Sequence, residues 1–193
     1  IYDRGQPLVQ LGMVVGTGFS ASFIPMMSHA HAQNRQGEFT RSAVSLLRMT
    51  SVFSAAAVTG LLAILPNVNN MLFGDREGIA VLSVYILAIF AASIMTAYHS
   101  ILQSLGQYKI SLVALAAGLA VKFFGNLLLV ERLGTMGASI ALIAGLAAMV
   151  LVLWMNSERA LRDVWFTDHF FLKLLAGCVV LFVTVWALRV GLE

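Results

Sequence analysis

Residues 79–102 read IAVLSVYILAIFAASIMTAYHSIL and contain no Asp, Glu, Lys or Arg. As an α-helix rising about 1.5 Å per residue, this stretch is longer than the hydrocarbon core of a bilayer, which is about 30 Å thick. Backbone N–H and C=O groups in hydrocarbon must pair within their own segment, and a helix achieves this. A membrane β-strand would alternate apolar and polar residues, whereas this run is continuously apolar. The stretch therefore predicts a transmembrane helix.

The composition extends this prediction to the whole chain. Of its 193 residues, 60% are hydrophobic and 11% are charged, whereas a soluble domain carries about 25% charged residues. Lipid must therefore cover most of the surface, and we expect an all-α integral membrane protein. Residues 1–193 are expected to form a single membrane domain with about six transmembrane helices. The predicted helices cover residues 8–27, 44–65, 79–102, 110–130, 136–154 and 170–188.

Three further features bound the class of protein. The chain begins at Ile1 rather than Met, so we expect it to be a piece of a longer protein. Its single cysteine, Cys178, lies in an apolar run and is expected to be an inert thiol. The net charge of +3 is small, and the basic residues are scattered at the ends of predicted helices. This distribution argues against a nucleic-acid partner.

The breaks between the predicted helices indicate an orientation. The first, third and fifth breaks, residues 29–39, 106–109 and 156–169, must lie on one side of the membrane. Cytoplasmic segments carry an excess of Lys and Arg. This side holds Arg35, Arg41, Arg48, Lys109, Arg159, Arg162 and Lys173, and the other side holds Arg4, Arg76, Arg132 and Arg189. We therefore expect the first side to be cytoplasmic and both chain ends to lie outside.

Small residues recur at a spacing of four on two predicted helices. Gly12 and Gly16 share a face of the first helix, and Ala141 and Gly145 share a face of the fifth. Such faces allow two helices to approach closely. We expect them to pack helices within one bundle rather than to form a dimer.

Several short motifs occur in an order that resembles a known family. The chain opens with YDRGQPL (residues 2–8), and its first predicted helix closes with FIPMMS (residues 23–28). GEFTR (residues 37–41), LP followed by MLFG (residues 65–74), GQYK (residues 106–109) and NLLLVERLG (residues 126–134) come next. This order resembles the MurJ/SpoVB-type (YtgP-like) flippases of the multidrug/oligosaccharidyl-lipid/polysaccharide (MOP) exporter superfamily.

The resemblance carries expectations about fold and function. It implies two lobes of six helices, with this chain supplying helices eight to thirteen, most of the second lobe. The first lobe, N-terminal in the same protein, would be its partner. The implied function is alternating-access transport of an undecaprenyl-pyrophosphate-linked cell-wall precursor, lipid II, across the bacterial plasma membrane. Export of another lipid-linked oligosaccharide, such as a capsule or teichoic unit, stays open, as does a non-transporting scaffold for wall synthesis.

Asp3 and Arg4 are the first candidate site residues. An ionisable residue at membrane depth is costly and is a functional candidate. A guanidinium presents a fixed fork of donors that matches phosphate oxygens, and the resemblance places Arg4 in the wall of the substrate cavity. Gln10 is expected to line the same polar path. In the alternative interpretation, Arg4 reaches the outer headgroups or pairs with Asp3.

Lys122 and Asn126 form the second candidate site. They are four residues apart, so they share one face of the fourth predicted helix. Lys122 lies deep in that helix and should face a partner or a water-filled cavity. Some members of the resembled family bind sodium with an Asn and an Asp at this spacing. This chain departs from that pattern, and we expect the Lys122 ammonium to replace the cation. A structural lysine held by backbone carbonyls, or by a carboxylate of the missing half of the protein, is the alternative.

No motif of an enzyme appears in the sequence. A nucleophile elbow, a phosphate loop, an HExxH sequence and a cysteine-rich metal site are all absent. We therefore expect no catalytic residue, no cofactor and no metal site. The expected partners are a lipid-linked oligosaccharide and membrane lipids.

Overall fold

The computed structural model describes the backbone of residues 2–73, 79–165 and 169–190, and the side chains of residues 14, 16–65, 81–165, 169–185 and 187. The elements are α1 (Tyr2–Ala32), α2 (Gln36–Phe73), α3 (Ile79–Ser104), α4 (Tyr108–Leu133), α5 (Thr135–Met155), α6 (Arg159–Arg162), the 3-10 turn η1 (Asp163–Trp165) and α7 (Phe170–Val190). The described part of the chain contains no strand.

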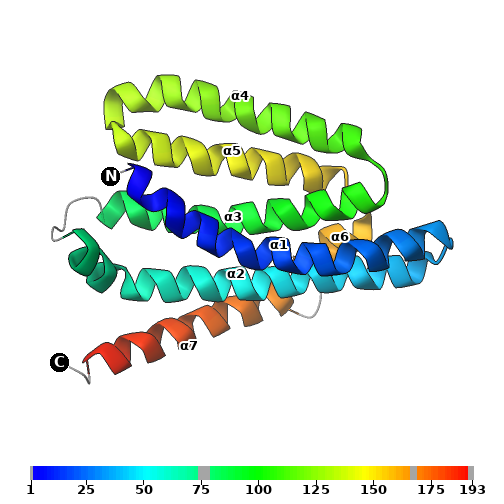
Figure 1. The fold of residues 1–193 in the computed structure, drawn as a ribbon, viewed down its shortest axis with the longest axis horizontal. Coiled ribbons are helices and arrows are strands. Elements are labelled where there is room, and N and C mark those ends of the chain that lie inside the picture. Colours follow the sequence, from blue (N-terminus) through cyan, green and yellow to red (C-terminus); the bar gives the residue numbers. More distant parts are fainter. Residues whose placement is uncertain (1, 74–78, 166–168, 191–193) are drawn as a thin grey trace.

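The long helices lie side by side, and each runs in the direction opposite to the long helix before it in the chain (Figure 1). The central helix α3 contacts α1, α2, α4 and α5. The helices at the two edges have fewer neighbours, since α4 packs mainly on α5 and α7 packs mainly on α2. Both chain ends lie at the end of the bundle opposite the α1–α2 turn (Figure 1). The first, third and fifth breaks therefore share one end, as an even number of crossings requires.

The structure corrects the lengths of the predicted helices. α1 extends beyond the predicted residues 8–27, and α2 extends at both ends beyond residues 44–65. An apolar window marks the part of a helix that crosses hydrocarbon, while polar residues continue the same helix into the headgroup layer. The predicted break at residues 29–39 therefore shrinks to residues 33–35. His29 and His31, which fall within that predicted break, belong to the last turn of α1.

Two helix ends show why the chain reverses where it does. Asn34 adopts a left-handed conformation with φ 55°, and Gly106 does so with φ 70°. At both turns the following N–H reaches back to a helix carbonyl, Arg35 to Ala30 at 2.9 Å and Gln107 to Leu102 at 2.9 Å. This pattern of a left-handed residue and a six-to-one bond ends a helix and satisfies its last carbonyls.

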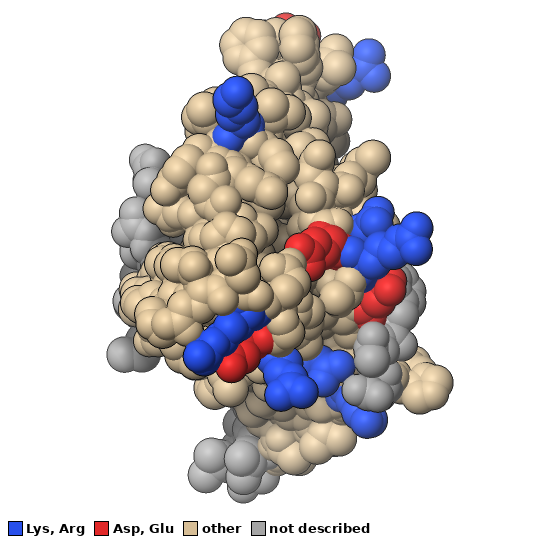
Figure 2. Space-filling view, turned by 90° about the vertical axis from the view of Figure 1, so that its right-hand side faces the viewer, with Lys and Arg blue, Asp and Glu red and all other residues tan. Residues whose placement is uncertain are grey.

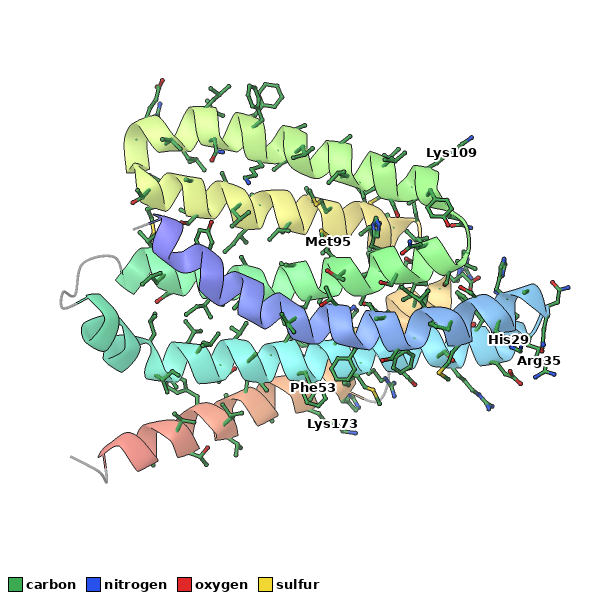
Figure 3. All side chains as sticks on the ribbon, in the orientation of Figure 1. His29, Arg35, Phe53, Met95, Lys109 and Lys173 are labelled. Atoms are coloured by element: carbon green, nitrogen blue, oxygen red, sulfur yellow. The ribbon has the colours of Figure 1, made fainter. Side chains whose placement is uncertain are left out.

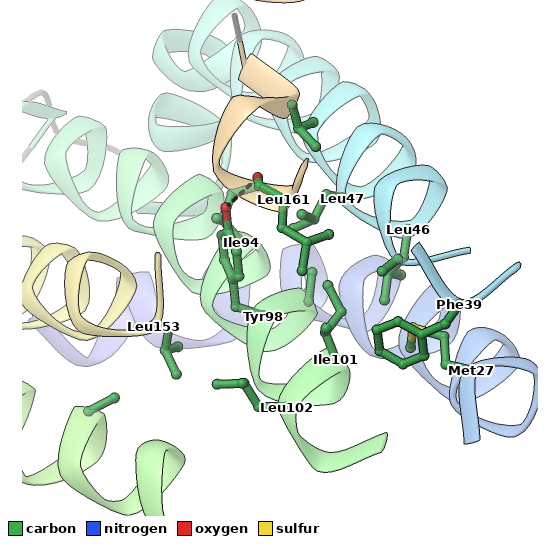
Figure 4. Close-up of a cluster of buried hydrophobic side chains, with 14 of the residues drawn as sticks. Met27, Phe39, Leu46, Leu47, Ile94, Tyr98, Ile101, Leu102, Leu153 and Leu161 are labelled. Atoms are coloured by element: carbon green, nitrogen blue, oxygen red, sulfur yellow. Dashed lines mark hydrogen bonds between the residues drawn. The ribbon is translucent and has the colours of Figure 1, made fainter. Parts of the chain in front are cut away.

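The largest buried cluster lies near the α1–α2 turn (Figure 4). Met27, Phe39 and Tyr98 are fully buried there, from α1, α2 and α3. Leu161 of α6 and Val164 of η1 complete the cluster, with 2% and 1% of their surface exposed. The fifth break, predicted as a charged loop at residues 156–169, therefore folds back as a short structured segment onto the bundle.

The outward faces of the edge helices are apolar. Leu128 and Leu112 of α4 are 71% and 64% exposed, and Leu172 and Val180 of α7 are each 62% exposed. Such faces are incompatible with water and suit hydrocarbon. Five stretches are long and apolar enough to cross a membrane: Gln36–Leu65, Val81–Ser104, Tyr108–Leu133, Thr135–Met155 and Arg159–Val185, the last of which includes residues 166–168 outside the described ranges. The first of the six predicted spans, residues 8–27 in α1, includes residues 8–13 and 15, whose side chains lie outside the described set.

Charged side chains gather at the end that carries the α1–α2 turn. Figure 2 looks onto this end and shows Lys, Arg, Asp and Glu side chains spread over an otherwise uncharged surface. Arg35 pairs with Glu38 at 3.4 Å, and Gln36 donates to Glu158 at 2.8 Å across the start of α2 and α6. Of the four basic residues predicted for the opposite side, Arg132 alone has a described side chain.

Candidate functional site

The substrate-binding candidates of the N-terminus are placed only by their backbone. Asp3 and Arg4 lie in the first turn of α1, and Gln10 lies two turns further on. Their side chains are outside the described residues, so the predicted phosphate contact stays a prediction. The first turn of α1 lies at the same end of the bundle as the α4–α5 turn (Figure 1).

Lys122 and Asn126 line one hollow between the second half of α4 and the start of α5. The hollow has a volume of about 860 Å³. Its wall is formed by Lys122, Phe123, Asn126, Leu127, Val130, Glu131, Gly134, Thr135 and Ala138. The spacing of four predicts that Lys122 and Asn126 share a face, and the structure places both on this wall. Their role in transport stays a prediction.

Lys122 is deep in its helix, since it lies 14 positions after Tyr108 and 11 positions before Leu133. At about 1.5 Å per residue, each end of α4 is more than about 16 Å away. Lys122 forms no hydrogen bond or salt bridge with any described residue. Whether Lys122 acts in transport or is a structural lysine therefore stays a prediction.

Asn126 provides a second unused polar atom in the same hollow. Its Oδ1 is buried and accepts no hydrogen bond from any described group. A buried acceptor without a partner costs about 1–3 kcal/mol, so such an atom in an apolar helix pair calls for an explanation. The wall offers the Lys122 ammonium and the Asn126 amide to a ligand that is anionic and carries hydroxyl or amide donors, and it also carries the Glu131 carboxylate, nine residues further along α4.

Small residues bring α4 and α5 together behind this hollow. A Cβ atom added to Gly145 would lie 2.9 Å from the Gly118 carbonyl oxygen and 3.0 Å from the Lys122 Cβ. A Cβ added to Gly125 would lie 3.0 Å from the Ala141 Cβ. The predicted small face of Ala141 and Gly145 therefore packs within the bundle. On α1, Gly16 faces Ser93 of α3, at 3.4 Å from a built Cβ to the Ser93 Cβ.

The histidines are not arranged to bind a metal. His29 pairs with Gln33 at 3.0 Å, and His31 lies beside the Phe39 ring, with centroids 6.1 Å apart. Both belong to the α1–α2 turn region, where Figure 3 labels His29 and Arg35. No three His, Cys, Asp or Glu residues come together as a metal site in the described part of the chain.

The structure also brings together a group of aromatic residues that the sequence does not predict. Phe90 of α3 lies 6.3 Å from Trp165 of η1, and Trp165 lies 6.2 Å from Phe170 of α7, measured between ring centroids. Phe170 in turn lies under the Arg48 guanidinium, 5.6 Å from its ring centroid. The sequence positions of Trp154 and Trp165 carry no sign that η1 folds back onto α3.

One curated protein is similar to most of the chain. It is the uncharacterized membrane protein YabM of Bacillus subtilis (strain 168), 39% identical over 150 residues, which are 77% of this chain. Together with five apolar helices in a strandless described fold, this likeness settles the class. The chain is an all-α, multi-pass integral membrane protein. It spans 28% of the length of YabM, and no protein-family profile and no solved structure matches it.

Proposed function

We propose that the full-length protein is a flippase that carries an undecaprenyl-pyrophosphate-linked cell-wall precursor, lipid II, across a bacterial plasma membrane. The observation that carries the proposal is the hollow between α4 and α5, where Lys122 and Asn126 line one wall and the buried Asn126 Oδ1 has no described hydrogen-bond partner. A cation at membrane depth is costly and is retained where a substrate or ion pathway needs it.

The chemistry of the substrate fits such a wall. A lipid-linked sugar donor combines an anionic pyrophosphate, hydroxyl and amide donors, and a long hydrocarbon tail. Lys122 would neutralise part of the anionic charge, and Asn126 would accept a hydrogen bond from the sugar or peptide part. The motifs in YDRGQPL and NLLLVERLG support the same substrate through their resemblance to MurJ/SpoVB-type flippases. In this proposal Arg4 binds the pyrophosphate, with Asp3 and Gln10 beside it.

The proposed mechanism is alternating access between this lobe and an N-terminal lobe. Transporters of this kind place the substrate near the midplane, where the two halves meet. The position of Lys122 near the middle of α4 and the outward apolar face of this helix support such a meeting surface. Lys122 supplies a fixed positive charge, so we expect transport without a sodium ion at this site, and an inward-negative membrane potential would favour outward movement of the anion.

Complementation tests the proposal. The full-length gene is expressed in bacteria depleted of their own lipid II flippase, and growth and lipid II accessibility at the outer surface are measured. We expect the wild type to restore growth and Lys122→Met to fail, because loss of one partner of a desolvated charge contact costs about 2–5 kcal/mol. Lys122→Arg, which keeps the charge, should retain partial function.

Lys109→Met is the matched control, because it removes the same charge from the exposed, opposite end of α4 (Figure 3). It should support growth at the wild-type level, and the amounts of all variants in the membrane should be equal by immunoblot. Normal growth with Lys122→Met would contradict the role of Lys122. The wild type could instead fail to restore growth but restore export of a capsule or teichoic unit in a mutant that lacks it. That lipid-linked unit, and not lipid II, would then be the substrate.

A further inference from the structure

A second hollow lies between α3, α5, η1 and α7, at the end of the bundle that carries α6. Its volume is about 590 Å³, within the range of about 300–1,000 Å³ that small-molecule sites occupy. We call it the aromatic hollow. Its wall is formed mainly by Phe90, Ile94, Tyr98, Trp154, Trp165 and Phe171. None of these residues belongs to the Lys122 site.

The polar atoms of this wall are already engaged. The Tyr98 hydroxyl donates to the Leu161 carbonyl at 3.4 Å, shown in Figure 4, and the Trp154 indole N–H donates to the Arg162 carbonyl at 3.4 Å. The hollow therefore presents ring faces and aliphatic carbon to its contents. A hydrocarbon chain suits such a wall, whereas a polar ligand would leave its own groups unsatisfied. Phe171 and Leu151 line the hollow and are 51% and 54% exposed, so the hollow opens to the surface of the bundle.

Two arginines lie beside the hollow on the short helix α6. The carbonyl of Arg162 is held by Trp154 of the wall, and Arg159 lies one turn before it. Neither forms a salt bridge or hydrogen bond through its side chain with a described residue. Guanidinium groups bind phosphate oxygens with a pair of parallel hydrogen bonds, and tryptophan favours the membrane interface. The aromatic hollow matches the acyl chain of an anionic lipid, and the arginine side chains beside it match the phosphate of its headgroup.

We propose that the aromatic hollow binds one acyl chain of an anionic phospholipid, whose headgroup phosphate is bound by Arg159 and Arg162. The charge asymmetry of the chain predicts that α6 faces the cytoplasm, where the leaflet is rich in anionic lipid. The bound lipid fills the space between α3, α5 and α7, and it joins η1 to the bundle. This site is independent of the lipid II proposal, because it uses neither Arg4 nor the Lys122 hollow.

Native mass spectrometry of the full-length protein tests the site. Phosphatidylglycerol and phosphatidylcholine with identical acyl chains are added to the detergent-purified protein, and retained lipid is counted at rising collision energy. We expect one retained phosphatidylglycerol, preferred over phosphatidylcholine. Arg159→Gln combined with Arg162→Gln should reduce that preference by up to about 25-fold, because each basic residue near an anionic surface contributes about fivefold. Ala147→Phe, which fills the hollow, should abolish retention of either lipid.

Two matched controls separate the site from general effects. Arg41→Gln removes an exposed arginine at the same end of the bundle, and Ala120→Phe adds the same ring on the exposed face of α4. Both should retain phosphatidylglycerol like the wild type. The proposal is overturned if the double arginine variant keeps the full preference, or if Ala147→Phe is folded and retains the lipid. It is also overturned if the wild type retains none, or if undecaprenyl phosphate displaces phosphatidylglycerol at lower concentration, since an isoprenoid would then be the occupant.

Discussion

Gly118 and Gly145 set how closely α4 approaches α5. A Cβ on Gly118 would collide with the Met149 side chain and would lie 2.8 Å from the Gly145 carbonyl oxygen. Met149 can move, but the backbone carbonyl cannot. We therefore expect Gly118→Ala to destabilise the protein by about 1–3 kcal/mol, the usual cost of overpacking. Thermal unfolding of the purified full-length protein, followed by fluorescence, would measure this as a lower Tm.

Gly60→Ala is the matched control for Gly118→Ala. Gly60 is also inside a long helix, and a Cβ there meets no described atom within 4 Å. Because alanine favours a helix over glycine by about 0.8–1.0 kcal/mol, this variant should be as stable as the wild type or more so. Equal Tm values for Gly118→Ala and Gly60→Ala would contradict the close contact between α4 and α5.

The sequence predicts only some of the residues of the candidate site and their surroundings. Lys122 is visible as a lone cation in an apolar run, and the spacing of four places Asn126 beside it. The sequence does not show that the Asn126 oxygen is buried without a partner, because that depends on how α5 packs across it. Whether Arg4, Asp3 and Gln10 face a cavity remains a prediction, since their side chains lie outside the described residues.

At the scale of elements, the segment formed by α6 and η1 joins four helices. Leu161 and Val164 are buried in the main cluster, and the Leu161 carbonyl accepts the Tyr98 hydroxyl. The five charges of residues 156–169 predict a solvated break. The buried pair three residues apart was the available signal for a folded turn, but a single apolar pair is too short to establish helical periodicity without the neighbouring helices.

Leu161→Ala tests the contribution of this segment. Removal of a buried leucine side chain leaves a cavity and costs about 2–5 kcal/mol. Because the segment joins α5 to α7 over α3, we expect a lower Tm together with faster proteolysis between α5 and α7. Leu119→Ala, on the 54% exposed face of α4, should change neither. A wild-type cleavage rate for Leu161→Ala would show that the segment contributes little to the packing of α7.

At the scale of the whole molecule, apolar length predicted every long helix but not where each one ends. All six predicted stretches lie inside helices of the structure, since length and composition alone decide that a segment must be helical in lipid. The ends depend on polar residues that continue a helix beyond hydrocarbon, as in α1 and α2. Which helices pack on which is also set by three-dimensional contacts, so the central place of α3 was not predictable from its equally apolar neighbours.

The orientation of the bundle gives the last prediction. The single cysteine, Cys178, allows a cysteine-free background through Cys178→Ser. New cysteines at Gln107 and Asn156 report on the end with the α1–α2 turn, and one at Thr135 reports on the opposite end. Because the end with the α1–α2 turn carries the excess of basic residues, we expect a membrane-impermeant maleimide to label only Thr135→Cys in intact cells.

Gln107→Cys and Asn156→Cys should react after permeabilisation, which also controls for their exposure. Labelling of these two in intact cells, with Thr135→Cys protected, would reverse the orientation. Arg159 and Arg162 would then face the outer leaflet, while the antiparallel packing of the helices would stand unchanged.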